Sequence, residues 1–253
     1  MKTIKVLSIG NSYSQDSTRY VHDAAKCVGV NIKTVNLYIG GCPLYLHYIN
    51  AMEDRRDYTM EFNGVNTGIK VSIKDALISD DFDIVTFQQV SRQSFKPDTF
   101  QPYLSYLEEY VRKYRPSAKI YIHQTWGYYE KGRNLGVYGF GSHAEMYAQV
   151  EAGYDAMYSM IDSCGLLPSG KAISLMHEAG IPCERLFRDD IHLSLGLGRY
   201  TSALAWIEYL TGFPAADVFF TELDEEVSDD EIAAAKEAAH KAVEWALSRG
   251  YKK

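Results

Sequence analysis

The chain has 253 residues, a mass of 28.6 kDa and 46% hydrophobic residues, which is enough to form the core of one α/β domain. Its formal net charge of -7 and sequence pI near 5.5 argue against a nucleic-acid partner, because binding to a phosphate backbone requires a basic surface. The sequence shows neither a run of about 20 apolar residues nor a signal-peptide pattern, so we expect a cytoplasmic protein with no membrane partner.

Apolar runs alternate with amphipathic stretches along the chain, a pattern that is typical of β-α-β units and a mainly parallel sheet. The pair Asn63-Gly64 lies between short apolar runs and predicts a small β-hairpin insertion at about 58–72. We therefore predict a single three-layer α/β/α domain over residues 1–253, with a sheet of about five strands. The expected strands are 3–9, 32–38, 83–87, 119–123 and 165–168, and the expected helices are 17–28, 72–79, 99–114, 142–163, 171–179, 195–211 and 228–249.

Ser12 follows the first expected strand, and Asp189 and His192 stand toward the C-terminal end of the chain. Binding sites of open α/β sheets form outside the carboxyl ends of the strands, so a serine in this turn faces a site. A serine hydroxyl becomes a nucleophile when a histidine accepts its proton and a carboxylate fixes the histidine tautomer. We therefore expect Ser12, His192 and Asp189 to form a catalytic triad.

Two segments of the chain resemble sequence blocks of the SGNH (GDSL-type) hydrolases. Gly10-Asn11-Ser12 resembles their first block, with Asn11 in place of the usual aspartate. Asp189-Asp190-Ile191-His192 is similar to their terminal Asp-x-x-His block, which makes Asp189 the triad acid and Asp190 its neighbour. The resemblance spans residues 4 to about 210, and it implies a flavodoxin-like α/β fold and ester hydrolysis through an acyl-enzyme.

The same resemblance implies an oxyanion hole with three donors. Ser12 supplies its own N–H, and Gly41, in the turn after the second strand, matches the glycine of the second block. The third block normally reads Gly-x-Asn-Asp, whereas Gln88-Gln89-Val90-Ser91 here is closer to the Trp-x-Gln-Gly-Glu pattern of the sialate and acetylxylan esterase branch. A glutamine amide can donate to an oxyanion, so Gln89 is the expected third donor and Gln88 is the alternative.

The loop after the fourth strand is rich in glycine and aromatic residues and carries few charges. Such a loop suits a polar but uncharged ligand, and we expect it to form a mobile wall over an acylated sugar. The candidate substrate contacts are Asn11, His123, Trp126 and Tyr128.

Each of these residues also has a purely structural explanation. Ser12 could be a helix cap, Gly41 part of a tight turn, and Gln89 a hydrogen-bonding residue at the end of a strand. His123 and Trp126 could be packing residues. The triad assignment rests on the blocks occurring together and in the expected order.

A metal or cofactor is not expected. Asp189, Asp190 and His192 lack a third and fourth partner at metal-ligand spacing. The cysteines show no Cys-x-x-Cys pattern and fit reduced thiols; they are Cys27, Cys42, Cys164 and Cys183.

We therefore predict a serine esterase that hydrolyses O-acyl esters, chiefly O-acetyl esters of a small-molecule or oligosaccharide substrate. Two alternatives stay open: a lipid acyl-ester or thioester hydrolase with the same triad, and a sugar-binding pseudoenzyme. The sequence determines neither the natural ester nor the oligomeric state.

Overall fold

The computed structural model describes residues 3–251, which contain one mixed sheet of seven strands in the order β4-β3-β2-β1-β5-β6-β7. Five of these strands are parallel to one another, and β3 and β4 are antiparallel. The strands are β1 (Thr3–Gly10), β2 (Asn31–Tyr38), β3 (Tyr58–Phe62), β4 (Val65–Val71), β5 (Ile84–Phe87), β6 (Lys119–His123) and β7 (Gly165–Leu167).

The parallel part of the sheet follows the expected strands closely. Each residue of β5 is buried, and the last five residues of β1 are buried as well, because helices cover both faces of these strands. Burial on both faces explains why these strands appear in the sequence as nearly continuous apolar runs. The predicted three-layer α/β fold is confirmed by the structure.

The hairpin at 58–71 extends the main sheet and does not form a separate ribbon. Strand β3 pairs antiparallel with β2, and β4 forms the edge. The connecting turn places Asn63 at φ 50° and Gly64 at φ 77°, the backbone angles that a tight hairpin turn requires and that asparagine and glycine tolerate. The sheet therefore has two strands more than the sequence predicted.

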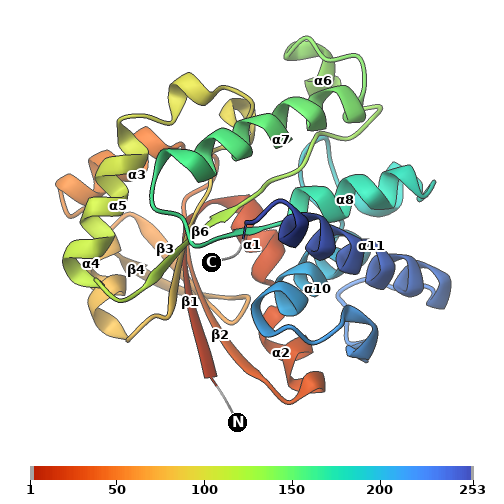
Figure 1. The fold of residues 1–253 in the computed structure, drawn as a ribbon, viewed down its shortest axis with the longest axis horizontal. Coiled ribbons are helices and arrows are strands. Elements are labelled where there is room, and N and C mark those ends of the chain that lie inside the picture. The colour runs from red at the N-terminus through yellow and green to blue at the C-terminus, as the bar shows by residue number, and fades with distance from the viewer. Residues whose placement is uncertain (1–2, 252–253) are drawn as a thin grey trace.

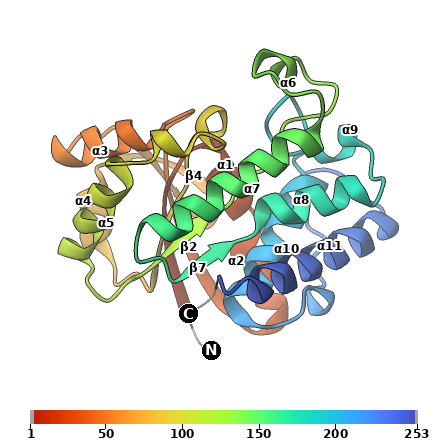
Figure 2. The same ribbon diagram turned by 45° about the horizontal axis from the view of Figure 1, so that its top comes forward.

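Helices lie on both sides of this sheet. Figure 1 shows α3, α4 and α5 on one side and α1, α2, α8, α10 and α11 on the other. Figure 2 shows α7 between α5 and α8. The helices are α1 (Ser12–Thr18), α2 (Val21–Ala25), α3 (Leu44–Met52), α4 (Ile73–Ser79), α5 (Tyr103–Tyr114), α6 (Arg133–Val137), α7 (His143–Met160), α8 (Ser169–Glu178), α9 (Cys183–Leu186), α10 (Leu197–Thr211) and α11 (Asp229–Ser248), with short 3₁₀ turns η1 (Lys26–Val28), η2 (Ser91–Gln93), η3 (Pro97–Thr99) and η4 (Ala215–Asp217).

Two helical predictions need correction. The helix expected at 17–28 is two helices, and the first begins at Ser12 because Asn11 adopts an extended backbone and caps it. Helix α3 was not predicted, because its N-cap residue Pro43 makes no side-chain capping hydrogen bond and the apolar and aromatic run at 44–49 carries no other start signal of a helix. Its start matters for function, because α3 follows directly after the glycine turn at 39–42.

The parallel strands direct their carboxyl ends to one edge of the sheet, where β1 leads to Ser12, β2 to the turn at 39–42, and β5 to Gln88. Helix α10 is buried along most of its length between the sheet and its neighbours α8 and α11, so it fixes the segment that precedes it. Among residues 3–251, the structure contains no helix with the length and apolar character needed to cross a membrane.

Candidate active site

Three side chains from opposite ends of the chain meet at this edge. Ser12 Oγ lies 2.9 Å from His192 Nε2, and His192 Nδ1 lies 2.8 Å from Asp189 Oδ2. Both distances are in the range of hydrogen bonds. Ser12 is 9% exposed, and the side chains of His192 and Asp189 are 23% and 49% exposed, so the triad lies at the surface with its hydroxyl recessed.

Asp189 is organised by a short turn. Its Oδ1 atom accepts hydrogen bonds from the backbone N–H groups of Ile191 at 2.9 Å and His192 at 2.7 Å, which leaves Oδ2 for the imidazole ring. Burial acts to raise the pKa of Asp189, but the Ile191 N–H and the His192 ring more than offset it, and the pKa is lowered overall. The carboxylate is therefore ionised at neutral pH and holds a proton on His192 Nδ1, which leaves Nε2 to accept the serine proton.

Asp16 anchors the segment that carries His192. This fully buried carboxylate on α1 accepts hydrogen bonds from Arg188 Nη1 and Arg199 Nε, each at 2.9 Å, and from the Leu193 N–H at 3.1 Å. Since α1 begins at Ser12, the clamp links the serine helix to both sides of His192. No sequence pattern indicates this role, because only the fold brings Asp16 and the two arginines together.

Asn11 positions the serine. Its Oδ1 atom accepts hydrogen bonds from the Tyr13 N–H at 3.0 Å and from Gln88 Nε2 at 2.7 Å, and its Nδ2 group donates to Cys42 O at 3.2 Å. The side chain was expected to contact substrate, and Asn11 does line the pocket in front of Ser12, yet it is 1% exposed with these polar contacts made inside the protein. Its contacts join the serine turn, the end of β5 and the glycine turn.

Gly41 faces the same pocket from the other side. It lies in a turn closed by a 3.2 Å hydrogen bond from the Cys42 N–H to Ile39 O, and its φ of +62° is one that glycine adopts easily. Among residues 3–251 the Gly41 N–H has no acceptor. The Ser12 N–H belongs to the first residue of α1, where a helix offers no internal acceptor.

Neither glutamine after β5 presents its amide to this pocket, contrary to expectation. Gln89 is fully buried; its Nε2 group donates to Thr99 Oγ1 at 3.2 Å, and its Oε1 atom accepts from the N–H groups of Leu44 at 3.0 Å and Val90 at 2.8 Å. Gln88 Nε2 donates to Asn11. The residues that line the pocket come next in the chain, at Val90, Ser91 and Arg92.

The other three expected substrate contacts are buried packing residues. Trp126 is fully buried, stacks on Tyr13 with ring centroids 4.3 Å apart, and donates from Nε1 to Ile191 O at 2.9 Å. Tyr128 donates its hydroxyl to Ser91 Oγ at 3.0 Å. His123 is fully buried, and this burial lowers its pKa to about 3, so the ring is neutral. The aromatic loop therefore supports the triad from behind.

The same loop is tied to the triad turn by its backbone. The Tyr129 N–H donates to Asp190 O at 2.9 Å, and the Asn134 N–H donates to Asp190 Oδ2 at 3.1 Å. Asp190 thus fastens the loop, while Asp189 contacts the imidazole. These hydrogen bonds hold the loop in place, so the expected mobile wall over the ligand is not found.

The pocket in front of Ser12 has a volume of about 280 Å³. Arg92, which no sequence pattern indicated, is part of its wall. Its complete lining is Asn11, Ser12, Tyr13, Tyr38, Gly40, Gly41, Val90, Ser91, Arg92, Ile191 and His192. No acidic side chain is among them.

Cys42 and His47 form a second pair of potential nucleophile and base near the glycine turn, with Sγ and Nδ1 3.5 Å apart. Burial raises the pKa of the Cys42 thiol to about 12 and lowers the pKa of His47 to about 3. A thiolate–imidazolium pair is thus disfavoured here, because both partners are kept neutral. Within residues 3–251 there is also no group of three or more histidine, cysteine or acidic side chains arranged to hold a metal ion.

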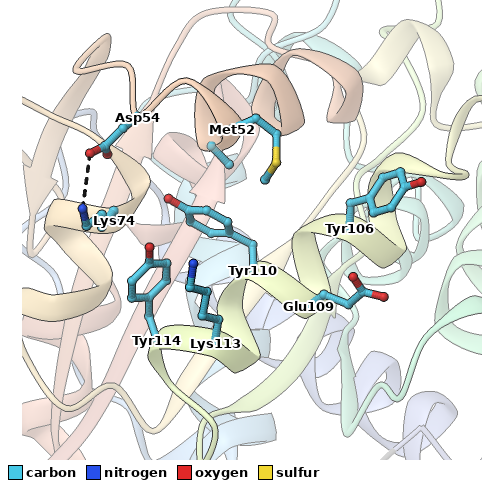
Figure 3. A pocket seen from close by; sticks show the side chains of 9 residues that line it. Met52, Asp54, Lys74, Tyr106, Glu109, Tyr110, Lys113 and Tyr114 are labelled. Atoms are coloured by element: carbon cyan, nitrogen blue, oxygen red, sulfur yellow. Dashed lines mark ion pairs between the residues drawn. The ribbon is translucent and has the colours of Figure 1, made fainter.

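A larger pocket of about 500 Å³ lies away from the triad, against α3, α4 and α5. Figure 3 shows tyrosine side chains of α5, among them Tyr106 and Tyr110, together with Met52 and the ion pair between Lys74 and Asp54. Its lining contains no serine, cysteine or histidine. This lining therefore contains no counterpart of the Ser12–His192 pair.

Known structures share this fold. A DUF4886 family protein from Bacteroides uniformis is 29% identical, with a TM-score of 0.88 over 98% of this chain and 99% of that one. A protein described as a candidate SGNH hydrolase from Slackia heliotrinireducens is 20% identical, with a TM-score of 0.57 over 82% of this chain and 98% of that one. A carbohydrate esterase family 3 protein from Talaromyces cellulolyticus is 12% identical, with a TM-score of 0.50 over 79% and 92% of the two chains.

The last two likenesses show that the α/β fold is that of SGNH hydrolases. A sequence search of curated proteins finds no match. The model of one family, described as a domain of unknown function (DUF4886), matches residues 5–242. The chain therefore belongs to the DUF4886 family.

Proposed function

We propose that this protein is a serine esterase that hydrolyses short O-acyl esters, chiefly O-acetyl esters of carbohydrates. The observation that carries the proposal is the hydrogen-bonded series Ser12 Oγ, His192 Nε2 and Asp189, open to a pocket whose wall also holds Gly41. These groups are the nucleophile, base and orienting acid of acyl transfer.

The reaction runs in two steps. Ser12 Oγ attacks the ester carbonyl while His192 Nε2 accepts its proton; the C–O bond to the alcohol breaks, and His192 returns the proton to the leaving oxygen. Water then gives a proton to His192 and attacks the acyl-enzyme, releasing the acid and restoring the serine hydroxyl. The N–H groups of Ser12 and Gly41 are the proposed donors to the oxyanion of both tetrahedral intermediates.

Pocket size supports a short acyl group. A volume of about 280 Å³ lies at the lower limit of small-molecule sites, which typically span about 300–1,000 Å³. A long lipid chain needs an extended apolar trough, and a pocket of this volume, where Ser91 and Arg92 stand beside Val90 and Ile191, does not supply one. A series of 4-nitrophenyl esters from acetyl to octanoyl tests this point: we expect kcat/KM to fall with chain length, and a rise toward octanoyl would favour a lipid esterase.

Support for a carbohydrate substrate comes from the fold likeness to the Talaromyces carbohydrate esterase. Acetate release from acetylated oligosaccharides is the direct assay. A panel of acetylated xylan, mannan and sialic acid substrates from which no acetate is released, combined with hydrolysis of simple aryl acetates, would reject the carbohydrate assignment while leaving the esterase assignment in place.

Replacement of the nucleophile tests the esterase assignment itself. We expect Ser12→Ala to abolish hydrolysis of 4-nitrophenyl acetate above the uncatalysed rate, with an unchanged circular dichroism spectrum. Ser79→Ala, on α4 and outside the pocket lining, is the matched control and should keep full activity. Full activity in Ser12→Ala would reject the proposed nucleophile.

A further inference from the structure

Among residues 3–251, Arg92 is the one arginine or lysine in the wall of the Ser12 pocket. It lies in η2 and is exposed to solvent. Most arginines of this protein form ion pairs with carboxylates, for example Arg19 with Asp224. Within residues 3–251, Arg92 and Arg133 are the arginines without such a partner.

The backbone that carries Arg92 is well held. Ser91 Oγ accepts the Tyr128 hydroxyl at 3.0 Å, and Ser91 O accepts the Ser94 hydroxyl at 2.8 Å. On the preceding side, the Val90 N–H donates to Gln89 Oε1 at 2.8 Å. The backbone at Arg92 is therefore held in place by contacts that do not involve the charge of the guanidinium, and the side chain extends from this backbone at the pocket.

The guanidinium lies beside the glycine turn. A Cβ atom built on Gly41 would stand 3.4 Å from Arg92 Nη1. The Gly41 N–H is one of the proposed oxyanion donors, so an ester bound at Ser12 would pass close to Arg92. None of the described residues that line the pocket is acidic, although the whole chain carries a formal net charge of -7.

An unpaired guanidinium at the mouth of a site is well suited to bind an anion of the ligand. Its planar fork of donors matches the two oxygens of a carboxylate or the oxygens of a phosphate, and such charge-assisted bonds are stronger than neutral ones.

We propose that Arg92 binds an oxyanionic group, carboxylate or phosphate, on the ester substrate, so that the enzyme prefers O-acyl esters of acidic compounds. This inference rests on the proposed esterase function. It narrows the substrate class from neutral acylated sugars to acidic ones, such as those that carry a uronate-type carboxylate or a phosphate.

Two acetate esters that differ in one charge test the inference. The probes are 4-acetoxybenzoate and its neutral methyl ester, and the measured quantity is the ratio of their kcat/KM values. We expect Arg92→Ala to lower the ratio by about 10–100-fold, mainly through KM of the anionic ester, because a hydrogen bond to a charged group is lost. Arg92→Lys keeps the charge without the fork and should fall between the two.

Arg133→Ala is the matched control, since it removes an equally unpaired exposed arginine on α6 that does not line the pocket. It should leave the ratio unchanged. 4-Acetoxyphenyl phosphate, compared with the benzoate, shows whether Arg92 favours phosphate or carboxylate. Raising the ionic strength should also reduce the wild-type ratio.

The outcomes are distinguishable. An unchanged ratio in Arg92→Ala, with both esters still hydrolysed, overturns the role of Arg92 and leaves the esterase function intact. An equal loss of kcat for both esters also overturns it, because the guanidinium would then act on the reaction oxyanion. Failure of the wild-type protein to hydrolyse either ester overturns both proposals.

Discussion

The pocket in front of Ser12 is smaller than the pocket beside α5, yet the residues around it are held by more buried hydrogen bonds. The first has a volume of about 280 Å³ and the second about 500 Å³. Behind the first, buried side chains such as Asn11 and Asp16 are hydrogen-bonded to several elements. The lining of the second includes exposed side chains such as Met52 and Tyr106, 51% and 44% exposed. Buried hydrogen bonds behind the pocket, more than its volume, therefore distinguish the pocket that contains Ser12.

The largest expected effect concerns the orienting acid. Asp189→Asn should lower kcat on 4-nitrophenyl acetate by about 10⁴-fold, because an amide in this turn can donate to His192 Nδ1 and favour the wrong tautomer. Asp190→Asn is the matched control: Asp190 accepts from the Asn134 N–H and makes no contact with the imidazole, so activity should change little. Equal losses in the two variants would reject Asp189 as the triad acid.

A large loss of stability is expected when the buried clamp is removed. Asp16→Ala leaves Arg188 and Arg199 without their shared carboxylate and should lower the free energy of unfolding by about 3–5 kcal/mol. Urea denaturation followed by circular dichroism measures this. Asp23→Ala removes the exposed pair with Lys26 and should cost about 0.5 kcal/mol or less. If the two variants lose the same stability, the clamp is no stronger than a surface pair.

Substitution of Gln89 shows whether this side chain has a structural role or a catalytic one. Gln89→Leu leaves the N–H groups of Leu44 and Val90 without an acceptor and should lower the free energy of unfolding by about 1–3 kcal/mol. Because the Gln89 amide donates to Thr99, kcat of the folded variant should change little. A loss of about 10²–10³ in kcat at unchanged stability would instead mark Gln89 as an oxyanion donor.

A small pH-dependent effect is expected far from both pockets, between α10 and α11. His240 Nδ1 lies 2.6 Å from Glu208 Oε1, and this hydrogen bond raises the pKa of His240 above 6.5. Glu244, 3.6 Å from Nε2, adds to this effect. A raised folded-state pKa contributes stability that is complete below the unfolded-state pKa and is lost as the pH rises through the folded-state value.

His240→Gln therefore destabilises the protein more at pH 5.5 than at pH 8.5. The difference should be on the order of 0.5 kcal/mol or less, since the His240 side chain is about half exposed. Urea denaturation of both proteins at the two pH values measures it. A destabilisation that is larger at pH 8.5 would contradict the sign.

No effect on catalysis is expected from the larger pocket. Tyr106→Ala removes an exposed ring from α5 and should leave kcat/KM for aryl acetates unchanged, with stability within about 0.5 kcal/mol of wild type. Steady-state kinetics on 4-nitrophenyl acetate provides the comparison. A loss of activity here as large as that of Asp189→Asn would remove the distinction between the pockets.

The sequence predicted the parts of this molecule that depend on local pattern. Apolar runs identified β1, β2, β5, β6 and β7, because strands buried on both faces need such runs. Spacing within one short motif also indicated His192 and Asp189, and the structure brings both side chains to Ser12. Strand order could not be inferred in this way, since it depends on contacts between distant segments, and the α3 helix was missed because no side-chain N-cap marks its start.

The residues that line the pocket were harder to predict from the sequence. An aromatic or amide residue on a loop can face a ligand or the protein interior, and packing decides between them: Trp126, Tyr128 and His123 face inward. Gln89 is withdrawn by its contacts to Leu44 and Thr99, which lie far away in sequence. Arg92 carried no sequence signal, because a single surface arginine is common; its lack of an ionic partner is visible only in three dimensions.

Covalent labelling tests most directly whether the Ser12 hydroxyl is an activated nucleophile. Treatment with a fluorophosphonate followed by peptide mass spectrometry should show one adduct, on Ser12, that a competing aryl acetate slows and Ser12→Ala eliminates. Absence of an adduct on Ser12 under conditions that fully label a known serine esterase, or equal labelling of Ser12→Ala, would contradict the account.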